Sequence, residues 1–498
     1  MSKKNIVPSL ADDLTKLITD SGLVLVGKIG TVGVGFIAHT LLVRNLGPAS
    51  FGAFSLALTI VSVFAGFAAI GMGQATTRFI SAADSSEIGE YITVCLSFVL
   101  VTGPIFALTL YFFNGYIEMF FGENNLGYFL RLLSILVVLR LISKVIHGIV
   151  RGFKLTKAKV INFDLIPLFL SLPILYFFIS IDKVILGAAI YYLIRPVTQI
   201  ILLTASARRS TELSFSFSLP SRRKISDVFS FSWPLAFESL VAIFLGSVDI
   251  LMLGRLATSE LVGQYRSIQP VAKTLLLLIQ VLTFIYLPIA TEYFEENRLD
   301  ELDVIYKTAT RWVAHMTFPL LLFYVLFGGE FINVMFGNEY TVAYSALAIL
   351  SFGMYSRVVI GPNAKTIQAI DRTREDLFAS LGGLLTNIAL NYYLIPIYGL
   401  EGAALATLSG YLVYNAIELI IIYAYADVGP FHMSLFTPFV PTALVWLFLV
   451  RMNLLSADTL FSLILIGIAI SVTHILSIFF TTGFTEKDRM LLDAMRKN

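Results

Sequence analysis

The chain has 498 residues, of which 57% are hydrophobic and only 14% are charged, and its mean hydropathy is +0.83. Soluble domains carry roughly 25% charged residues, so this composition excludes a water-soluble globule and indicates an integral membrane protein. The net charge of +2, with no long run of Lys or Arg, gives no sign of nucleic-acid binding. The single cysteine, Cys95, excludes an intramolecular disulfide and a cysteine-based metal site.

Residues 1–21 differ from a secretory signal peptide because they contain neither an apolar core nor a cleavage site of small residues. Leu10, Leu14, Leu17 and Ile18 fall on one face of a helix. The pattern predicts a short amphipathic helix that lies on the cytoplasmic surface of the membrane before the first span. A disordered tail is the alternative interpretation.

Apolar segments of about twenty residues, the length that crosses a bilayer as a helix, follow along the whole chain. They predict an all-α integral membrane fold with about fourteen transmembrane helices. The expected spans are 22–43, 50–72, 91–113, 126–149, 159–180, 184–205, 226–253, 261–289, 312–335, 343–368, 376–397, 402–425, 434–452 and 459–482.

Lys and Arg are concentrated in every second connection between these spans, and the alternate connections carry few of them. Because positively charged connections stay in the cytoplasm, we expect both termini to be cytoplasmic in a multi-pass protein of the cell membrane. The longest polar, Ser-rich connection lies at 206–225, where a cytoplasmic linker between two halves would lie.

The two halves resemble each other at an offset of about 211–216 residues. "LLVRNLGPASFGAF" from Leu41 pairs with "LMLGRLATSELVGQY" from Leu251, and "GAA" at Gly187 recurs at Gly402. Such a parallel repeat predicts two six-helix lobes of equal topology with a substrate site between them. The expected parts are the N-terminal segment 1–21, the N-lobe 22–205, the linker 206–225, the C-lobe 226–425, and 426–498 with two extra helices and a cytoplasmic tail.

Basic side chains lie within several spans, and Arg140, Lys144 and His147 share one helical face. A charged residue at the centre of a span costs roughly 2.5–3.5 kcal/mol, so we expect these groups to face water, an acid or an anionic ligand such as a phosphate or diphosphate. For cations near span ends, reaching the lipid headgroups is the alternative. The candidate anion-binding set is Lys28, Arg44, Arg78, Arg140, Lys144, Arg195, Arg255 and Lys273.

A second group of polar residues lies in the C-terminal half. Asn387 and Asn391 are one helical turn apart, Thr407 follows in the next span, and Asp249 is an acid within the seventh span. Oxygen ligands of this kind suit a small hard cation such as Na⁺. Hydrogen bonds that join helices are the alternative interpretation of the two amides.

Three motifs, "RNLGPASFGAFSLA", "VDILMLGRL" and "YLIPIYGLEGAALATLSGY", occur in an order that resembles the oligosaccharide-lipid flippases of the multidrug/oligosaccharidyl-lipid/polysaccharide exporter superfamily. The resemblance implies an alternating-access flippase for a polyprenyl-(di)phosphate-linked oligosaccharide, which serves surface polysaccharide or glycan assembly. It also implies a cation site in the second lobe of some members, where Asp249, Asn387, Asn391 and Thr407 hold comparable positions. Asn391 is neutral where a second acid is found in the family's site, and this weakens the Na⁺ interpretation.

Two other functions are open. A cation-coupled multidrug extrusion antiporter would present acids rather than cations to its substrate, and a membrane glycosyltransferase would need an acidic, metal-binding outer loop. The five histidines are scattered, and no nucleotide-binding or hydrolase motif occurs. We therefore expect no enzyme, no metal and no cofactor, apart from coupling to Na⁺ or H⁺. The expected partners are the lipid-linked oligosaccharide, membrane lipids and other glycan-assembly proteins, with the chain itself a monomer that binds no nucleic acid.

Overall fold

The computed structural model describes residues 7–84, 87–155, 158–210, 220–452 and 457–481, and side chains from residue 30 onward within these ranges except at 210, 284 and 285. All regular structure in the described ranges is helical, which confirms the predicted all-α fold. Helix α1 begins at Val7, but the side chains of the predicted amphipathic segment 1–21 lie outside the described residues.

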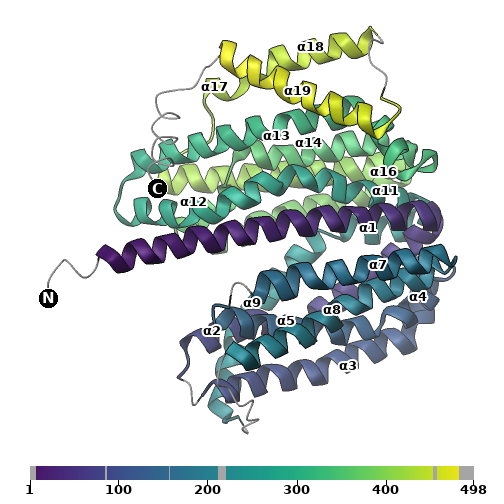
Figure 1. Ribbon diagram of the computed structural model, residues 1–498, viewed down its shortest axis with the longest axis vertical. Coiled ribbons are helices and arrows are strands. Elements are labelled where there is room, and N and C mark those ends of the chain that lie inside the picture. Colours follow the sequence, from purple (N-terminus) through teal and green to yellow (C-terminus); the bar gives the residue numbers. More distant parts are fainter. Residues whose placement is uncertain (1–6, 85–86, 156–157, 211–219, 453–456, 482–498) are drawn as a thin grey trace. The chain divides into compact units, whose positions relative to one another are not determined.

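Contacts divide the chain into two compact units, Met1–Ser247 and Val248–Asn498. In unit 1, α3, α5 and α8 run alongside one another (Figure 1), and an apolar core that includes Ile80, Ile92 and Ile149 joins α2, α3 and α5. The elements of unit 1 are α1 (Val7–Ala69), α2 (Met72–Ala82), α3 (Ile88–Phe121), α4 (Leu126–Leu133), α5 (Ile135–Gly152), the π-helix η2 (Lys159–Leu165), α7 (Ile166–Ser180), α8 (Val184–Ser210) and α9 (Arg222–Leu245).

In unit 2, α13, α14 and α16 pack side by side (Figure 1), and a core that includes Tyr286, Tyr306 and Ile422 joins α12, α13 and α16. Its elements are α10 (Val248–Leu256), α11 (Ser259–Lys273), η3 (Thr274–Leu276), α12 (Leu277–Glu295), α13 (Leu299–Phe336), η4 (Asn338–Ala343), α14 (Tyr344–Ile360), α15 (Asn363–Ala369), α16 (Thr373–Ala426), α17 (Met433–Phe436), α18 (Phe439–Arg451) and α19 (Leu460–Thr481).

Within the described residues, ten helices are long and apolar enough to cross a membrane, or eleven if one bent pair forms a single span. Helices α1 and α16 each join two predicted spans across a sharp break, at Gly47 and at Gly399. If the halves of α1 and α16 are counted separately and the apolar pair α4 and α5 is added, the number of membrane-spanning segments among the described residues rises from eleven to fourteen. The protein is therefore a multi-pass membrane protein with the predicted class of fold.

Both breaks arise from a glycine with positive φ. Gly47 has φ 70° and precedes Pro48, while Gly399 has φ 54° and follows Pro396 by three residues. Residues with a side chain adopt such angles at a steric cost, whereas glycine does not. The connection between the predicted spans 376–397 and 402–425 is therefore the point at which α16 folds back as a helical hairpin.

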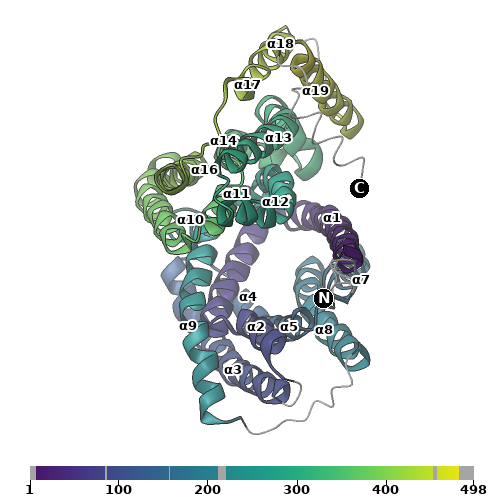
Figure 2. The same ribbon diagram turned by 90° about the vertical axis from the view of Figure 1, so that its left-hand side faces the viewer.

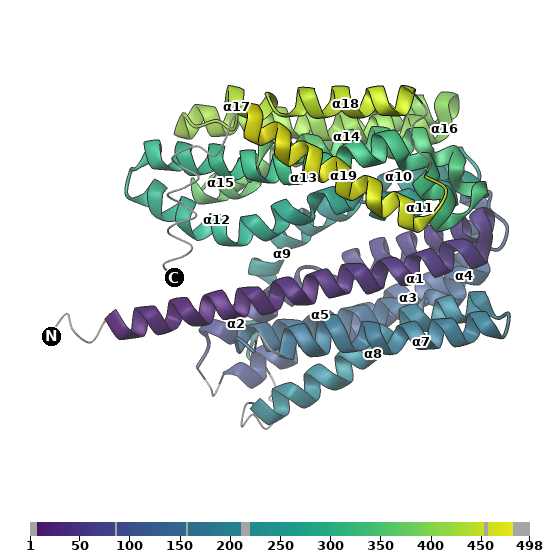
Figure 3. The ribbon, with the colours of Figure 1, turned by 45° about the horizontal axis from the view of Figure 1, so that its top comes forward.

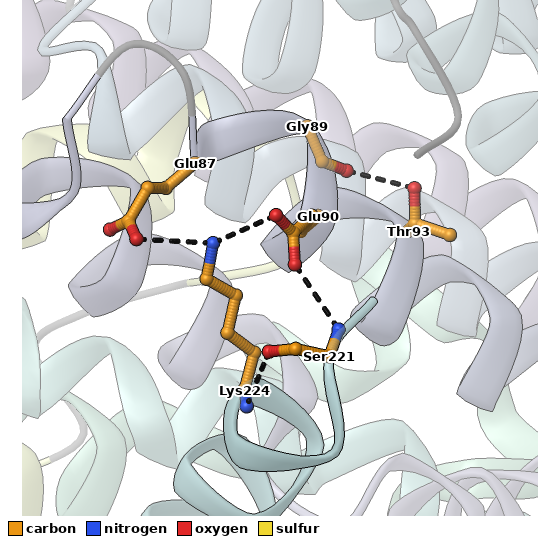
Figure 4. Close-up of polar contacts among 6 residues, drawn as sticks. All are labelled: Glu87, Gly89, Glu90, Thr93, Ser221 and Lys224. Carbon is orange, nitrogen blue, oxygen red and sulfur yellow. Dashed lines mark hydrogen bonds and ion pairs between the residues drawn. The ribbon is translucent and has the colours of Figure 1, made fainter. Parts of the chain in front are cut away.

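The division into units differs from the predicted linker at 206–225, because α9 groups with unit 1. Helix α9 packs against α1, α2 and α3 (Figure 2), and ends at Leu245, before α10. Its first turn is held at the start of α3, where Lys224 Nζ lies 3.2 Å from Glu87 Oε1 and 3.0 Å from Glu90 Oε1 (Figure 4). The backbone N–H of Ser221 also donates to Glu90 Oε2 over 3.2 Å.

The two extra C-terminal helices, predicted as the last two spans, lie along α13 (Figure 3). Phe439 of α18 stacks on Phe318 of α13, with ring centroids 4.4 Å apart. Buried polar contacts join α19 to both of these helices. His474 of α19 lies 3.3 Å from His315 of α13 and 3.0 Å from Thr442 of α18. Aromatic packing and these polar contacts therefore dock the pair on unit 2.

Small residues bring neighbouring helices close at matching places in the two units. Ala188 and Ala189, and likewise Ala403 and Ala404, are fully buried. A Cβ atom added at Gly187 would collide with Phe178 of α7, and one added at Gly402 would collide with the backbone of Leu394 in the first half of α16. The repeated Gly-Ala-Ala pattern therefore permits close helix packing in both units.

Candidate functional site

The residues of the predicted cation site come together inside unit 2. Asp249 lies in the first turn of α10, Asn387 and Asn391 lie in the first half of α16, and Thr407 lies in its second half. All four are buried, with between 0 and 5% of their surface exposed. The hairpin at Gly399 places Thr407 opposite Asn387, because its two halves run antiparallel.

Four side chains donate hydrogen bonds to the Asp249 carboxylate. Asn387 Nδ2 and Asn391 Nδ2 each lie 3.1 Å from Oδ1, while Thr407 Oγ1 lies 2.8 Å and Tyr265 OH 3.1 Å from Oδ2. A buried carboxylate is tolerated only where such donors replace its lost hydration. Every one of these bonds joins two helical segments, so the cluster holds α10, α11 and both halves of α16 together.

The same atoms can be judged as ligands of a cation. Asn391 Oδ1 is buried and makes no hydrogen bond among the described residues. Rotation of an Asn side chain by half a turn exchanges its nitrogen and oxygen, which places a ligand oxygen where a donor was. With the Asp249 carboxylate and the Thr407 and Tyr265 hydroxyls, the cluster then presents oxygen atoms of the kind that hard cations bind. The donor set therefore fits Na⁺ chemically.

Tyr265 is the member that the sequence did not reveal. It is fully buried on α11, and its hydroxyl lies 3.3 Å from Thr407 Oγ1 as well as touching Asp249. The turn at Ala257 and Thr258, where Thr258 caps α11, brings it back beside α10. Sequence alone offered one signal, a tyrosine between polar residues in "VGQYRS", and nothing there specified the direction of its hydroxyl.

The predicted anion-binding cations of unit 1 lie on several helices. Arg140, on α5, is half-buried and donates from Nη1 to Ser62 Oγ of α1 over 2.6 Å. Lys144, one turn later, is exposed, and its charge is close enough to interact with that of Arg140. These two cations are brought together as the shared helical face predicted.

The other members of the set have neighbours of their own. Arg78 of α2 is exposed and lies over the Phe231 ring at 4.1 Å, and Arg195 of α8 lies 5.8 Å from the Tyr191 ring. Arg44 is exposed near the end of the first half of α1. Arg255, exposed, and Lys273, half-buried, belong to unit 2, and the side chain of Lys28 lies outside the described residues.

His147, the third residue of the predicted basic face on α5, packs against an aromatic ring. His147 stacks on Phe163 of η2, with ring centroids 4.0 Å apart. Nearby, Lys159 Nζ forms an ion pair of 2.9 Å with Asp164 Oδ2, so this acid balances a cation of its own segment.

Comparison with solved structures places the chain in a known fold. The lipid II flippase MurJ in an inward closed conformation has a TM-score of 0.74, with 15% identity over 91% of this chain and 98% of that one. An inward-facing multidrug resistance MATE family transporter has a TM-score of 0.61, with 17% identity over 80% of this chain and 94% of that one. At such identities the likeness shows the fold alone, a two-lobed membrane transporter fold.

Sequence comparison identifies relatives of similar length. The "Probable low-salt glycan biosynthesis flippase Agl15" of Haloferax volcanii is 21% identical over 77% of this chain and 78% of its own. The teichuronic acid biosynthesis protein TuaB of Bacillus subtilis is 24% identical over 57% of this chain and 58% of its own. A sequence model described as MatE matches residues 234–393. The model described as polysaccharide biosynthesis protein matches residues 17–294, more than half of the chain, and the protein therefore belongs to the polysaccharide biosynthesis protein family.

Proposed function

We propose that this protein is a flippase that moves a polyprenyl-(di)phosphate-linked oligosaccharide across the cytoplasmic membrane for the assembly of a surface polysaccharide or glycan. Membership of the polysaccharide biosynthesis protein family carries the proposal. It is supported by one relative described as a probable low-salt glycan biosynthesis flippase and another described as a probable flippase, and by the fold shared with a lipid II flippase. Transport of an intact lipid-linked sugar breaks no covalent bond, so the protein acts as a transporter and not as an enzyme.

The cations of unit 1 supply the chemistry for the substrate's phosphate groups. Arg140 is held by Ser62 within the span, and the exposed Lys144 lies one turn away on the same helix. A guanidinium binds phosphate oxygens through two parallel hydrogen bonds, and an ammonium acts as a point charge. Together they suit a diphosphate at a membrane depth where an unpaired cation costs roughly 2.5–3.5 kcal/mol.

The Asp249 cluster is the proposed site of a coupling Na⁺ ion. The ion would be held by Asp249, Asn387, Asn391 and Thr407, and the hydroxyl of Tyr265 would make Tyr265 the fifth liganding residue. A bound cation would compensate the charge of the carboxylate and free the two amides from donating to it. Because Asp249, Tyr265, Asn387 and Thr407 lie on separate helical segments, ion binding would change how tightly these segments are joined.

Reconstitution tests the flippase proposal directly. Proteoliposomes carrying a fluorescent polyprenyl-diphosphate-linked oligosaccharide are treated with a membrane-impermeant quencher, which reports movement of the lipid between leaflets. We expect Arg140→Gln to slow the movement of the lipid about tenfold or more. A tenfold change in rate corresponds to about 1.4 kcal/mol, which is less than the free energy lost with one charge-assisted hydrogen bond. The matched control is Arg131→Gln, which changes an exposed arginine of α4. Equal rates in vesicles with and without the wild-type protein would refute the proposal.

Drug extrusion is the second candidate, because the MatE model matches residues 234–393. The same vesicles loaded with a cationic dye separate the two functions. Dye efflux driven by an ion gradient, without movement of the lipid-linked sugar, would favour the extrusion antiporter.

A further inference from the structure

A second polar layer lies between the two halves of α16. Asp376 lies eleven residues before Asn387 in the first half, and Glu418 lies eleven residues after Thr407 in the second half. Both are therefore farther from the turn at Gly399 than the first layer is. Eleven residues correspond to about three helical turns, or roughly 16 Å, so they return to the same helix face. The antiparallel pairing that places Asn387 against Thr407 therefore also places Asp376 against Glu418. Between the two layers, Gly383 and Gly410 let the halves approach closely.

The Glu418 carboxyl has too few donors for a buried anion. The residue is fully buried, and its Oε2 accepts a hydrogen bond from Asn363 Nδ2. Its Oε1 atom is also buried and accepts no hydrogen bond from the described residues. The Asp249 carboxylate, by contrast, accepts four. The surroundings of Glu418 therefore differ from those of Asp249, the carboxylate of the proposed Na⁺ site.

The neighbour of Glu418 is a second carboxyl group. Asp376 is half-buried, its Oδ1 accepts from Tyr414 OH over 3.0 Å, and its charge acts on Glu418 across the hairpin. Two ionised carboxylates are both acceptors, so they can share a hydrogen bond only when one of them carries a proton. Two ionised carboxylates that face each other in a buried hairpin also repel, and one proton held by the pair removes this repulsion.

Charge balance gives the same count. Arg357 of α14 lies over the Tyr414 ring at 4.7 Å and interacts with Glu418. One guanidinium and two carboxyls are neutral together when the pair holds one proton, and the membrane interior disfavours a net charge. The ammonium of Lys365 is not counted, because it donates to Gln368 Oε1 over 2.8 Å at an exposed position where water solvates its charge. The other titratable groups that face the pair are Lys365 of α15, which acts on Asp376, and Tyr306 of α13, which interacts with Glu418.

Water can reach the cluster from two directions. Asp376 lies in the first turn of α16, beside the exposed residues Thr373 and Arg374. In addition, a cavity of about 180 Å³ in unit 2 is lined by Arg357, Asn363 and Lys365. Asn363 donates to Glu418 Oε2, and the charge of Arg357 acts on both carboxyls, so two residues that line this cavity also adjoin the cluster. We propose that Asp376 and Glu418 form a proton-binding site that exchanges one proton with water at this end of α16.

Infrared titration of the purified protein tests the site without any transport assay, so it can fail or succeed independently of the flippase proposal. In the wild type we expect a protonated-carboxyl C=O band that shifts in D₂O and disappears as the pH rises. Glu418→Gln keeps the size of the side chain and an oxygen for Asn363, and it should remove the band. The matched control, Glu375→Gln, changes the residue just before Asp376, a glutamate that pairs with Arg372, and should leave the band unchanged. A titrating band that is the same in Glu418→Gln and wild type would overturn the proposal.

Asp376→Asn provides a second readout should Glu418→Gln not fold. Loss of the neighbouring negative charge should let Glu418 release its proton at a pH lower by about 1 unit. An unchanged midpoint in this variant would contradict a shared proton.

Discussion

Asp249 illustrates how much can depend on one buried side chain in a membrane protein. Its carboxylate accepts hydrogen bonds from Tyr265, Asn387, Asn391 and Thr407, and its exposed fraction is only 2%. In these contacts the amide nitrogens of Asn387 and Asn391 donate to Asp249 and join helices. With the amide oxygens turned toward the centre of the cluster instead, the same side chains would serve as ligands of a cation. The two interpretations of the amides therefore differ by a side-chain rotation and the presence of an ion.

Replacing Asp249 separates these interpretations. An ion that binds only the folded protein stabilises it by RT ln(1 + [ion]/Kd), so Na⁺ should raise the thermal unfolding midpoint of the purified wild type above that in choline at equal ionic strength. Asp249→Asn should abolish this increment, because it removes the only formal charge among the five ligands. It should also lower the midpoint in choline, since helix-joining hydrogen bonds are worth about 0.6–2 kcal/mol each.

Asp300→Asn, at an exposed carboxylate in the first turn of α13, is the control and should keep the full Na⁺ increment. If Asp249→Asn also keeps it, the ion binds elsewhere, and the cluster is a structural hydrogen-bond network.

At the scale of elements, the α16 hairpin organises unit 2. Its two halves carry the polar layer at Asn387 and Thr407 and the layer at Asp376 and Glu418, with glycines between them. A Cβ atom at Gly410 would lie 2.9 Å from the Gly383 carbonyl oxygen and 3.0 Å from Asn387 Cβ. Real Cβ atoms do not approach so closely, so both polar layers depend on the absence of a side chain here.

Gly410→Val should therefore destabilise unit 2. Overpacking of this kind costs about 1–3 kcal/mol, and the displaced Asn387 should weaken the Na⁺ increment as well. Thermal unfolding of the purified protein with and without Na⁺ measures both effects. Gly467→Val on α19 is the control, because no atom lies within 4 Å of a Cβ added there. Equal midpoints for the two variants would show that the hairpin can open without penalty.

At the scale of the whole molecule, the distribution of Lys and Arg makes a prediction about topology. Both termini and the 206–225 linker are expected in the cytoplasm. Exposed Asp371 then lies on the cytoplasmic side, and exposed Asp182 and Asn338 on the outer side. The single native thiol, Cys95, is buried and can be replaced by Ala to give a background without reactive cysteines.

A membrane-impermeant maleimide added to intact cells should label cysteines at Asp182 and Asn338 but not one at Asp371. Labelling at Asp371 should appear only after the membrane is permeabilised. The reverse pattern would invert the topology and remove the assignment of the basic connections to the cytoplasm.

The resemblance to a known family grouped Asp249 and Thr407 with the two asparagines. The sequence by itself determined the class of the protein, the places of its spans, the connections near Gly47 and Gly399 and the shared helix face of Asn387 and Asn391. These features are local or periodic, because hydropathy, helical spacing and the backbone freedom of glycine act within a few residues. Only the tertiary structure decided that Tyr265 reaches Asp249, that α9 packs with unit 1, and that Asn363 donates to Glu418. Such contacts join residues as distant in the sequence as Phe67 and Phe244. They depend on helix rotation and register, which packing of the whole unit sets. The two asparagines of "TNIALNYYLIPIYGLEGAALATL" could be assigned to one helix face from their spacing, but their partners required the fold.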